Sequence, residues 1–234
     1  MTRAQDIAGR LTEVRQQIAD AAGRAGRPAE SVRLVAVSKK MPADDVRAAL
    51  AAGQLDFGEN YAQELRDKRA AFESGGALPR WHYIGPLQRN KVKFLAGQVA
   101  LIHSVADVDI LEEIDRRAGA AQDCLVQVNI AGEAQKSGAP LEAVPALLDA
   151  FARCERASCV GLMLIPPFDA DAAQTRRHFA ALRGLRDREA AIARPRVTLR
   201  ELSMGMSGDF VEAIAEGATL VRVGTAIFGA RVTG

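Results

Sequence analysis

The segment VRLVAVSKK, residues 32–40, is a short apolar run that ends abruptly in two lysines. Its first six residues are apolar except for Arg33, which is typical of a strand buried on both faces of a parallel sheet. Pro42 follows and opens a helical pattern. Because α/β folds bind their ligands at the carboxyl ends of parallel strands, Lys39 stands where a ligand would bind.

A lysine at the end of a strand is either a reactive amine or an ordinary solvated side chain. Partial desolvation and neighbouring cations lower the pKa of an ammonium group and can leave a nucleophilic amine. For a lone lysine the solvated side chain is the commoner case, since charged groups are normally exposed. The interpretation of Lys39 therefore depends on the rest of the chain.

Composition narrows the class of protein. The chain has 234 residues, of which 48% are hydrophobic and 26% charged, as expected of a globular protein. A net charge of +2, with no block of Lys or Arg longer than a pair, gives no electrostatic argument for nucleic-acid binding. No apolar run reaches the ~20 residues of a membrane span, and the first residues show no signal-peptide pattern. We therefore expect a cytoplasmic protein that does not bind membranes.

The three cysteines, Cys124, Cys154 and Cys159, are odd in number and lack the spacing of metal ligands. This pattern predicts reduced thiols in or near the core of a cytosolic protein.

Strand-like and helix-like patterns alternate along the chain. An amphipathic helix comes first, with apolar residues at spacings of four, three and four: Ile7, Leu11, Val14 and Ile18. We expect strands at residues 33–37, 55–57, 81–84, 100–103, 124–130, 159–164, 199–202 and 219–223. Helical patterns lie between them at residues 43–51, 61–72, 88–95, 108–118, 141–153, 172–193 and 209–215.

Eight strands joined by helical crossovers predict an α/β fold, a (β/α)₈ TIM barrel, with the first helix as an addition. We find no linker or repeat, so residues 1–234 should form a single domain. An open doubly wound sheet is the alternative. Its first strand would usually be followed by a glycine-rich phosphate turn, whereas SKKMP at residues 38–42 contains no glycine.

In a closed barrel, the residues that follow each strand meet at one face. Here they provide one lysine amine together with several amides, hydroxyls and glycines, but no cluster of carboxylates. This set argues against a hydrolase or a divalent-metal site.

The last two of these loops are the most informative. They read SMGMSGD (residues 203–209) and RVGTAIFG (residues 222–229). In barrels, the loops after strands seven and eight often bind phosphate through glycine amides, a hydroxyl and a helix N-terminus. Ser207 and Thr225 supply hydroxyls, and Gly205, Gly208 and Gly224 allow close approach of the backbone. Each loop alone could be a tight turn with a helix cap, but together they predict a phosphate site.

A lysine on the first strand and a phosphate site on the last two suggest a phosphorylated aldehyde held as a Schiff base. Pyridoxal 5′-phosphate is the common molecule of this kind.

Several segments resemble the pyridoxal phosphate homeostasis protein family, whose members resemble the barrel domain of alanine racemase. They are LVAVSKK, FGENYAQEL, WHYIGPLQRNK, VNIAGEAQKSG, GLMLIP, LSMGMSGDF and VRVGTAIFGAR, and they extend over residues 32–231, nearly the whole chain.

The resemblance implies roles for particular residues. It makes Lys39 the Schiff-base lysine and puts Asn60 beside the cofactor. It also implies that Ser207, Gly224 and Thr225 contact the phosphate. Arg222 occupies the place where the racemase fold presents an arginine to the pyridine nitrogen. Lys40 departs from the family pattern, which has an uncharged residue there more often, and its charge should favour the neutral amine of Lys39.

Two functions remain open at this point. In the first, the protein is a non-catalytic carrier, a monomer that takes part in intracellular pyridoxal phosphate homeostasis and delivers the cofactor to apo-enzymes. In the second, it is a pyridoxal phosphate-dependent amino-acid racemase. Alanine racemases carry a second, β-rich domain and take one catalytic base from a tyrosine of the partner subunit. We expect that domain to be absent, because the chain ends at Gly234 soon after the eighth strand.

Other features also favour the carrier. The only tyrosines are Tyr61 and Tyr83, both early in the chain, and an arginine at the pyridine nitrogen would leave the ring a weak electron sink. We therefore assign no catalytic residues. A barrel aldolase that uses Lys39 as a base is a third and weaker possibility, because the complete motif set argues against it.

Five further side chains have simpler interpretations. His82 either lines the pocket or packs near it, and both alternatives stay open. His103 and His178 are expected to be structural or surface residues, and Met163 is expected to fill the barrel. Lys136 is expected to be a surface lysine rather than part of a loop at the mouth.

Overall fold

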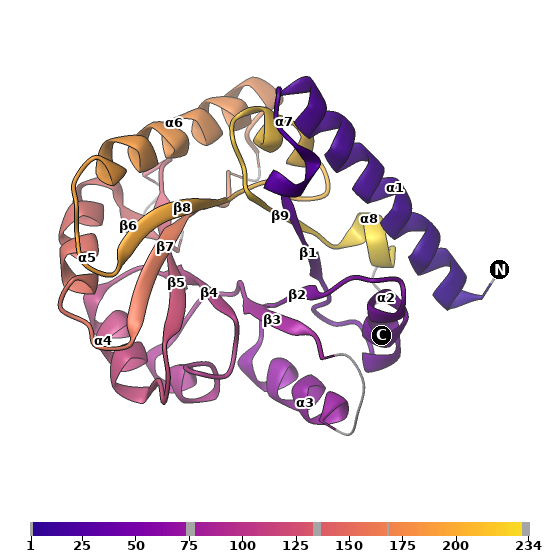
Figure 1. The fold of residues 1–234 in the computed structure, drawn as a ribbon, viewed down its shortest axis with the longest axis horizontal. Helices are drawn as coiled ribbons and strands as arrows, with labels where there is room; N and C mark the ends of the chain where they lie inside the picture. Colours follow the sequence, from indigo (N-terminus) through magenta and orange to yellow (C-terminus); the bar gives the residue numbers. More distant parts are fainter. Residues whose placement is uncertain (1, 74–77, 133–136, 168, 231–234) are drawn as a thin grey trace.

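The strands form a closed parallel barrel (Figure 1). The computed structural model describes residues 2–73, 78–132, 137–167 and 169–230. In this part of the chain the barrel strands, in their order around the ring, are β1 (Arg33–Val37), β2 (Asp56–Glu59), β3 (Arg80–Tyr83), β4 (Leu101–Val105), β5 (Gln122–Asn129), β7 (Ala157–Met163), β8 (Val197–Ser203) and β9 (Leu220–Val223). The ring closes where β9 pairs with β1, and every pairing is parallel.

The predicted (β/α)₈ barrel is therefore confirmed, and the open doubly wound alternative is wrong. One strand was not predicted: β6 (Ala139–Pro140) pairs with β5 outside the ring. The strand boundaries differ from the expected ones by up to two residues, as at Val197, where β8 begins earlier than predicted.

Helices cover the outside of the barrel (Figure 1). They are α1 (Arg3–Arg24), α2 (Ala43–Ala51), α3 (Ala62–Phe72), α4 (Val108–Arg117), α5 (Val144–Phe151), α6 (Ala172–Ala190), α7 (Phe210–Ala215) and α8 (Thr225–Phe228), with short 3₁₀ segments η1 (Ala29–Ser31), η2 (Arg89–Phe94) and η3 (Leu141–Ala143). Two predicted helices differ in type. The segment expected at residues 88–95 is the 3₁₀ helix η2, and the one expected at residues 141–153 divides into η3 and α5, whose first turn contains a proline.

The N-terminal helix α1 begins with a capping box, in which Thr2 and Gln5 satisfy each other's backbone amides. Its predicted apolar face is buried and packs against α2, α7 and α8 outside the barrel. Arg3 pairs with Asp45 of α2 and also donates to the backbone oxygen of Phe228, 2.8 Å away. The helix thus connects the first and last units of the barrel.

A separate apolar cluster fills the inside of the barrel. It contains Val35, Leu101, Leu125, Val160, Met163 and Leu220. Val35 faces inward while its neighbours Leu34 and Ala36 pack outward, as expected of alternating side chains in a barrel strand. Met163 is fully buried in this cluster, so its predicted role as a filler is confirmed.

The cysteines are free thiols, as predicted. Cys124 and Cys159 are buried and Cys154 is half-buried. Burial raises the pKa of Cys159 to about 12 and that of Cys154 to about 11. These thiols are therefore protonated and unreactive at neutral pH.

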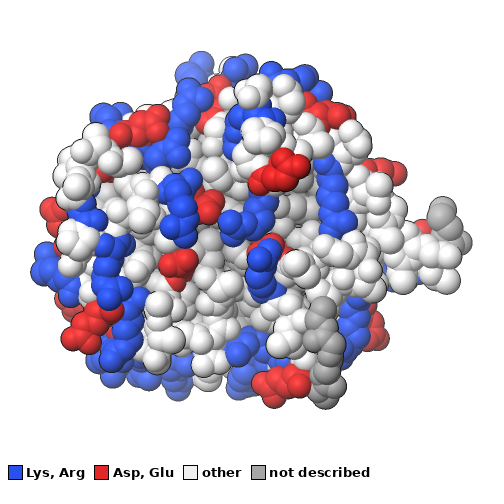
Figure 2. Space-filling model, viewed as in Figure 1, with Lys and Arg blue, Asp and Glu red and all other residues white. Residues whose placement is uncertain are grey.

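The surface carries charges of both signs. Figure 2 shows Lys and Arg side chains interspersed with Asp and Glu over one face of the molecule. No helix in the described ranges is long and apolar enough to cross a membrane. Those ranges also contain no group of three or more His, Cys, Asp or Glu residues that could hold a metal ion.

Candidate functional site

Lys39 lies in the tight turn that follows β1, at the carboxyl end of the barrel. Its side chain is half-buried, whereas that of Lys40 is exposed. Lys40 has φ 61°, in the left-handed region that costs a non-glycine residue about 1 kcal/mol or more. The backbone amide of Lys40 donates to Glu64 Oε1 at 2.5 Å. A carboxylate of α3 thus holds the strained turn in place.

A buried ionic cluster lies beneath this turn. Lys68 Nζ donates to the backbone oxygen of Ser38 at 2.6 Å and to Glu59 Oε1 at 2.7 Å. It also pairs with Glu64 Oε1 at 2.8 Å, and Ser38 Oγ donates to Glu59 Oε1 at 2.7 Å. Two of these contacts, to the backbone oxygen and the side chain of Ser38, fix the residue immediately before Lys39.

The neighbours of Glu59 only partly offset the cost of burying its carboxyl group. Burial raises the pKa of Glu59 to about 7, against the opposing effects of Lys68 and Ser38. Its second oxygen, Oε2, is buried and has no hydrogen-bond partner among the described residues. The sequence contains one signal for this cluster: Glu64 and Lys68 are four residues apart on α3, the spacing of a helical ion pair.

Asn60 follows β2 at the same end of the barrel. Its Oδ1 atom is buried and accepts no hydrogen bond from the described part of the protein. A Cβ atom at Gly85 would lie 2.1 Å from the backbone oxygen of Asn60, so only glycine allows the two loops to approach this closely. An unpartnered acceptor held rigidly at the rim is suited to a donor on a ligand.

The two loops predicted to bind phosphate come together. The backbone N–H of Gly224 donates to Ser207 Oγ at 3.2 Å, and Thr225, which is exposed, begins α8 next to it. Gly205 has φ +94°, and a Cβ there would lie 2.6 Å from that of Ala213. The loop after β8 is therefore folded tightly back onto α7.

The phosphate loops also lie beside the lysine turn. β1 and β9 are neighbours in the barrel, with Ala36 opposite Val223. A Cβ atom at Gly224 would lie 3.2 Å from the backbone oxygen of Val37. The glycine amide is thus adjacent to the strand end that carries Lys39, two residues further on.

Arg222 lies on β9 opposite Val35, whose side chain is inside the barrel. The guanidinium group is buried and donates from Nη1 to Ser203 Oγ at 2.7 Å and from Nη2 to the backbone oxygen of Leu164 at 2.9 Å. Burial lowers the pKa of Arg222 to about 10, while the charge of Asp209 acts in the opposite direction. The group is therefore a buried cation at neutral pH, just below the phosphate loops.

The histidines are not at this mouth. His82 lines a cavity of about 240 Å³ at the amino end of the barrel and bonds to Asp56, the first residue of β2. Both alternatives placed His82 in or near the ligand pocket, whereas the structure places it at the other end of the barrel, beside Asp56. His103 is fully buried and His178 is half-buried on α6, so both are structural as expected. Lys136 lies outside the described residues.

The tyrosines are also unsuited to act as bases. Tyr83 donates its hydroxyl to the backbone oxygen of Pro86 at 2.9 Å, and burial raises its pKa to about 12. Tyr61 is exposed at the beginning of α3.

The chain is similar to proteins of known family. The profile of the alanine racemase N-terminal domain family matches residues 10–232. A protein of Pseudomonas aeruginosa named pyridoxal phosphate homeostasis protein is 43% identical over 229 residues, which cover 96% of each chain.

Two solved structures extend the comparison. PipY of Synechococcus elongatus, solved with pyridoxal phosphate bound, is 38% identical with a TM-score of 0.84, and the match covers 95% of this chain and 100% of PipY. Alanine racemase of Corynebacterium glutamicum is 16% identical with a TM-score of 0.68, and the match covers 97% of this chain but 62% of the racemase. The second likeness concerns the fold alone.

Proposed function

The chain belongs to the pyridoxal phosphate homeostasis protein family, and on this premise we propose that it binds pyridoxal 5′-phosphate and holds it for use elsewhere in the cell. In this proposal the amine of Lys39 forms a Schiff base with the aldehyde. Bound pyridoxal phosphate supplies an aldehyde that reacts reversibly with amines. A protein that holds it in this way limits its reaction with other amines, without efficient catalysis of its own.

The observation that carries the proposal is the proximity of the lysine turn to the two phosphate loops. The amide of Gly224 donates to the hydroxyl of Ser207, and Gly224 lies beside the end of β1. A single small ring that bears an aldehyde and a phosphate needs an amine and an anion site this near to each other. A P-loop or an open sheet would not offer this pairing.

The other residues fit the same ligand. Ser207, Thr225 and the amide of Gly224 would hold the phosphate. The buried cation of Arg222 would donate to the pyridine nitrogen and oppose its protonation. The unpartnered Oδ1 of Asn60 would accept a hydrogen bond at the rim.

The site does not support a two-base racemase. Such an enzyme needs an acid or base within hydrogen-bond reach on each face of the reacting carbon. Tyr83 is committed to a backbone oxygen, and His82 is at the opposite end of the barrel. Glu59 titrates near neutral pH, but it is fully buried beneath the turn. The described residues therefore offer no suitable base for the second face.

The proposal extends to the setting of the protein. We propose one domain, residues 1–234, which acts as a monomer, because the whole candidate site is built from one chain. The balanced surface charge and the free, protonated cysteines support a cytoplasmic location. The recipients would be apo-enzymes that depend on pyridoxal phosphate.

The test compares transfer of the cofactor to an apo-enzyme with catalytic turnover of alanine. The protein is loaded with pyridoxal phosphate, separated from free cofactor and mixed with an apo-enzyme that requires it. We expect activation of the apo-enzyme and no racemisation of alanine above the rate of the free cofactor. A kcat near the ~10 s⁻¹ typical of enzymes, abolished by Lys39→Ala, would overturn the carrier in favour of a racemase.

A further inference from the structure

Two histidines inside the barrel connect the buried Arg222 to a carboxylate at the opposite end. Arg222 Nη1 donates to Ser203 Oγ at 2.7 Å, and that oxygen lies 2.9 Å from Nδ1 of His103. Nε2 of His103 lies 2.9 Å from Nδ1 of His82. Nε2 of His82 in turn lies 3.0 Å from Oδ1 of Asp56. Four hydrogen bonds thus form one continuous chain.

All five side chains of this chain are more than nine-tenths buried. They come from five strands, and the chain crosses the barrel interior from the first residue of β2 to the third residue of β9. Because these side chains are almost wholly buried, their donors and acceptors are expected to find protein partners. The two end groups, Arg222 and Asp56, therefore determine which atom donates in each hydrogen bond.

The two ends fix the direction of every bond. A guanidinium group can only donate, and an ionised carboxylate can only accept. Asp56 is ionised: burial acts to raise its pKa, but hydrogen bonds from His82 and Arg80 hold the pKa below its usual value. Four bonds require four protons, which come from Arg222, the hydroxyl of Ser203 and one ring N–H on each neutral histidine.

Only one arrangement of those protons satisfies all four bonds with neutral rings. His82 must donate from Nε2 to Asp56, so its Nδ1 accepts from Nε2 of His103. Nδ1 of His103 then accepts from the hydroxyl of Ser203. Both imidazoles are therefore Nε2–H tautomers, and Ser203 Oγ presents its lone pairs to Arg222.

Burial and charged neighbours oppose a second proton on His103. Burial lowers the pKa of His103 well below its ordinary value, and the positive charges of Arg222 and Arg33 add to this effect. At the amino end, Arg80 pairs with Asp56 Oδ2 at 2.6 Å.

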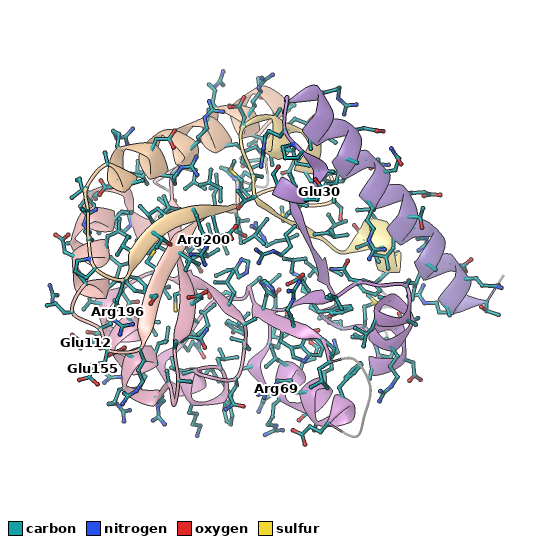
Figure 3. All side chains as sticks on the ribbon, viewed as in Figure 1. Glu30, Arg69, Glu112, Glu155, Arg196 and Arg200 are labelled. Atoms are coloured by element: carbon teal, nitrogen blue, oxygen red, sulfur yellow. The ribbon has the colours of Figure 1, made fainter. Side chains whose placement is uncertain are left out.

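The rest of the cavity around His82 carries three further ion pairs. Arg33 pairs with Glu201 at 3.3 Å, and Arg200 pairs with Asp123 at 3.7 Å and with Glu201 at 3.8 Å. Arg200 is labelled in Figure 3, on β8 near the barrel axis. The carboxylates around His82 are thus already paired with arginine side chains.

We propose that His82 and His103 are positioning residues of the cofactor site. Through Ser203 they hold the guanidinium group of Arg222 in one orientation, with its remaining N–H groups aimed at the ring of the ligand. This inference rests on the proposed function, because it assumes that Arg222 faces the pyridine nitrogen of pyridoxal phosphate. It assigns a role to residues that lie far from Lys39.

The first experiment needs no cofactor. Long-range ¹H–¹⁵N correlation spectra of the protein alone report which ring nitrogen of each histidine carries the proton. We expect His82 and His103 both to be Nε2–H tautomers and His103 to stay neutral between pH 6 and 8. An Nδ1–H tautomer at either ring, or titration of His103 in that range, would overturn the directed chain.

The second experiment tests the link to Arg222. Ser203→Ala removes the oxygen that joins His103 to the guanidinium group, and Ser104→Ala removes a buried hydroxyl that has no partner among the described residues. The probes are pyridoxal phosphate and its analogue with carbon in place of the ring nitrogen. Since a charge-assisted bond would be lost, we expect Ser203→Ala to weaken binding of pyridoxal phosphate about tenfold and binding of the analogue less than threefold.

The outcomes separate the two claims. Ser104→Ala should bind both ligands within about twofold of the wild type. Equal losses for both ligands in Ser203→Ala, or no loss, would show that the chain is merely structural. If the wild-type protein does not bind pyridoxal phosphate, the proposed function fails, and with it the link to the ring, while the spectra still decide the direction of the chain.

Discussion

The ammonium group of Lys68 lies 2.6 Å from the backbone oxygen of Ser38, the residue immediately before Lys39. This contact joins α3 to the end of β1 inside the protein, since the side chain of Lys68 is 7% exposed and that of Glu59 is fully buried. The position of the predicted reactive lysine therefore depends on an ion cluster in the neighbouring βα unit.

Lys68→Met should destabilise the protein and loosen the turn. It leaves the buried Glu59 without its cation, so we expect the free energy of unfolding at neutral pH to fall by about 2 kcal/mol or more. Urea unfolding measures this change. Lys93→Met is the matched control, because Lys93 is exposed and its loss should cost less than about 0.5 kcal/mol. Equal unfolding midpoints for the two variants would contradict the role of the cluster.

Glu59 should make stability depend on pH. Burial raises its pKa to about 7 from the ordinary value of 4.5, so the folded state keeps a proton that the unfolded state loses between these values. The free energy of unfolding should therefore fall as pH rises from about 4.5 to 7, by about 3 kcal/mol in total. Because glutamine cannot ionise, the Glu59→Gln variant should not show this decrease in the free energy of unfolding. Urea unfolding of the wild type and of Glu59→Gln from pH 4.5 to 8 measures this difference. If the free energy of unfolding changes with pH in the same way in both proteins, the prediction is wrong.

Ser207 and Thr225 should matter more for a phosphorylated ligand than for an unphosphorylated one. Each charge-assisted hydrogen bond contributes about 1.5–3 kcal/mol, so the double alanine variant should bind pyridoxal phosphate at least about tenfold more weakly. Binding of pyridoxal should change less. Thr198→Ala, at an exposed site on β8, controls for loss of a hydroxyl. Equal losses of affinity for the two ligands would show that the phosphate binds elsewhere.

Gly85→Ala should disrupt the rim of the site. The new Cβ would lie 2.1 Å from the backbone oxygen of Asn60, so the two loops must separate, at a cost of about 2 kcal/mol or more. Gly9→Ala is the control, because a Cβ at Gly9 meets nothing within 4 Å and alanine favours the helix. Thermal unfolding should show a lower Tm for the first variant and an unchanged or higher one for the second. A Tm of Gly85→Ala at or above the wild type would contradict the close approach.

Much of the barrel could be predicted because a buried parallel strand appears in the sequence as a short run of apolar residues. The run at residues 33–37 became β1 with the same limits, since its apolar residues end at a polar turn. The two-residue β6 could not be predicted, because Ala139–Pro140 carries no periodicity and pairs with β5 only in the folded chain.

The candidate site was predictable to the extent that its residues follow strands. Ser207 and Gly224 were expected to meet because their strands were expected to be neighbours, and they do meet. The contact of His103 with Ser203 joins residues 100 positions apart, and no pattern of neighbouring residues in the sequence predicts it. A polar side chain directed into a barrel interior looks, in sequence, like any other residue of an alternating strand.

The most direct test of the account is to map the lysine that carries the cofactor. The protein is incubated with pyridoxal phosphate, reduced with borohydride and digested, and the modified peptide is identified by mass spectrometry. We predict a single adduct on Lys39, lost together with the cofactor absorbance in Lys39→Ala and retained in Lys40→Ala. An adduct on Lys40 or Lys136, or one that persists in Lys39→Ala, would contradict the account.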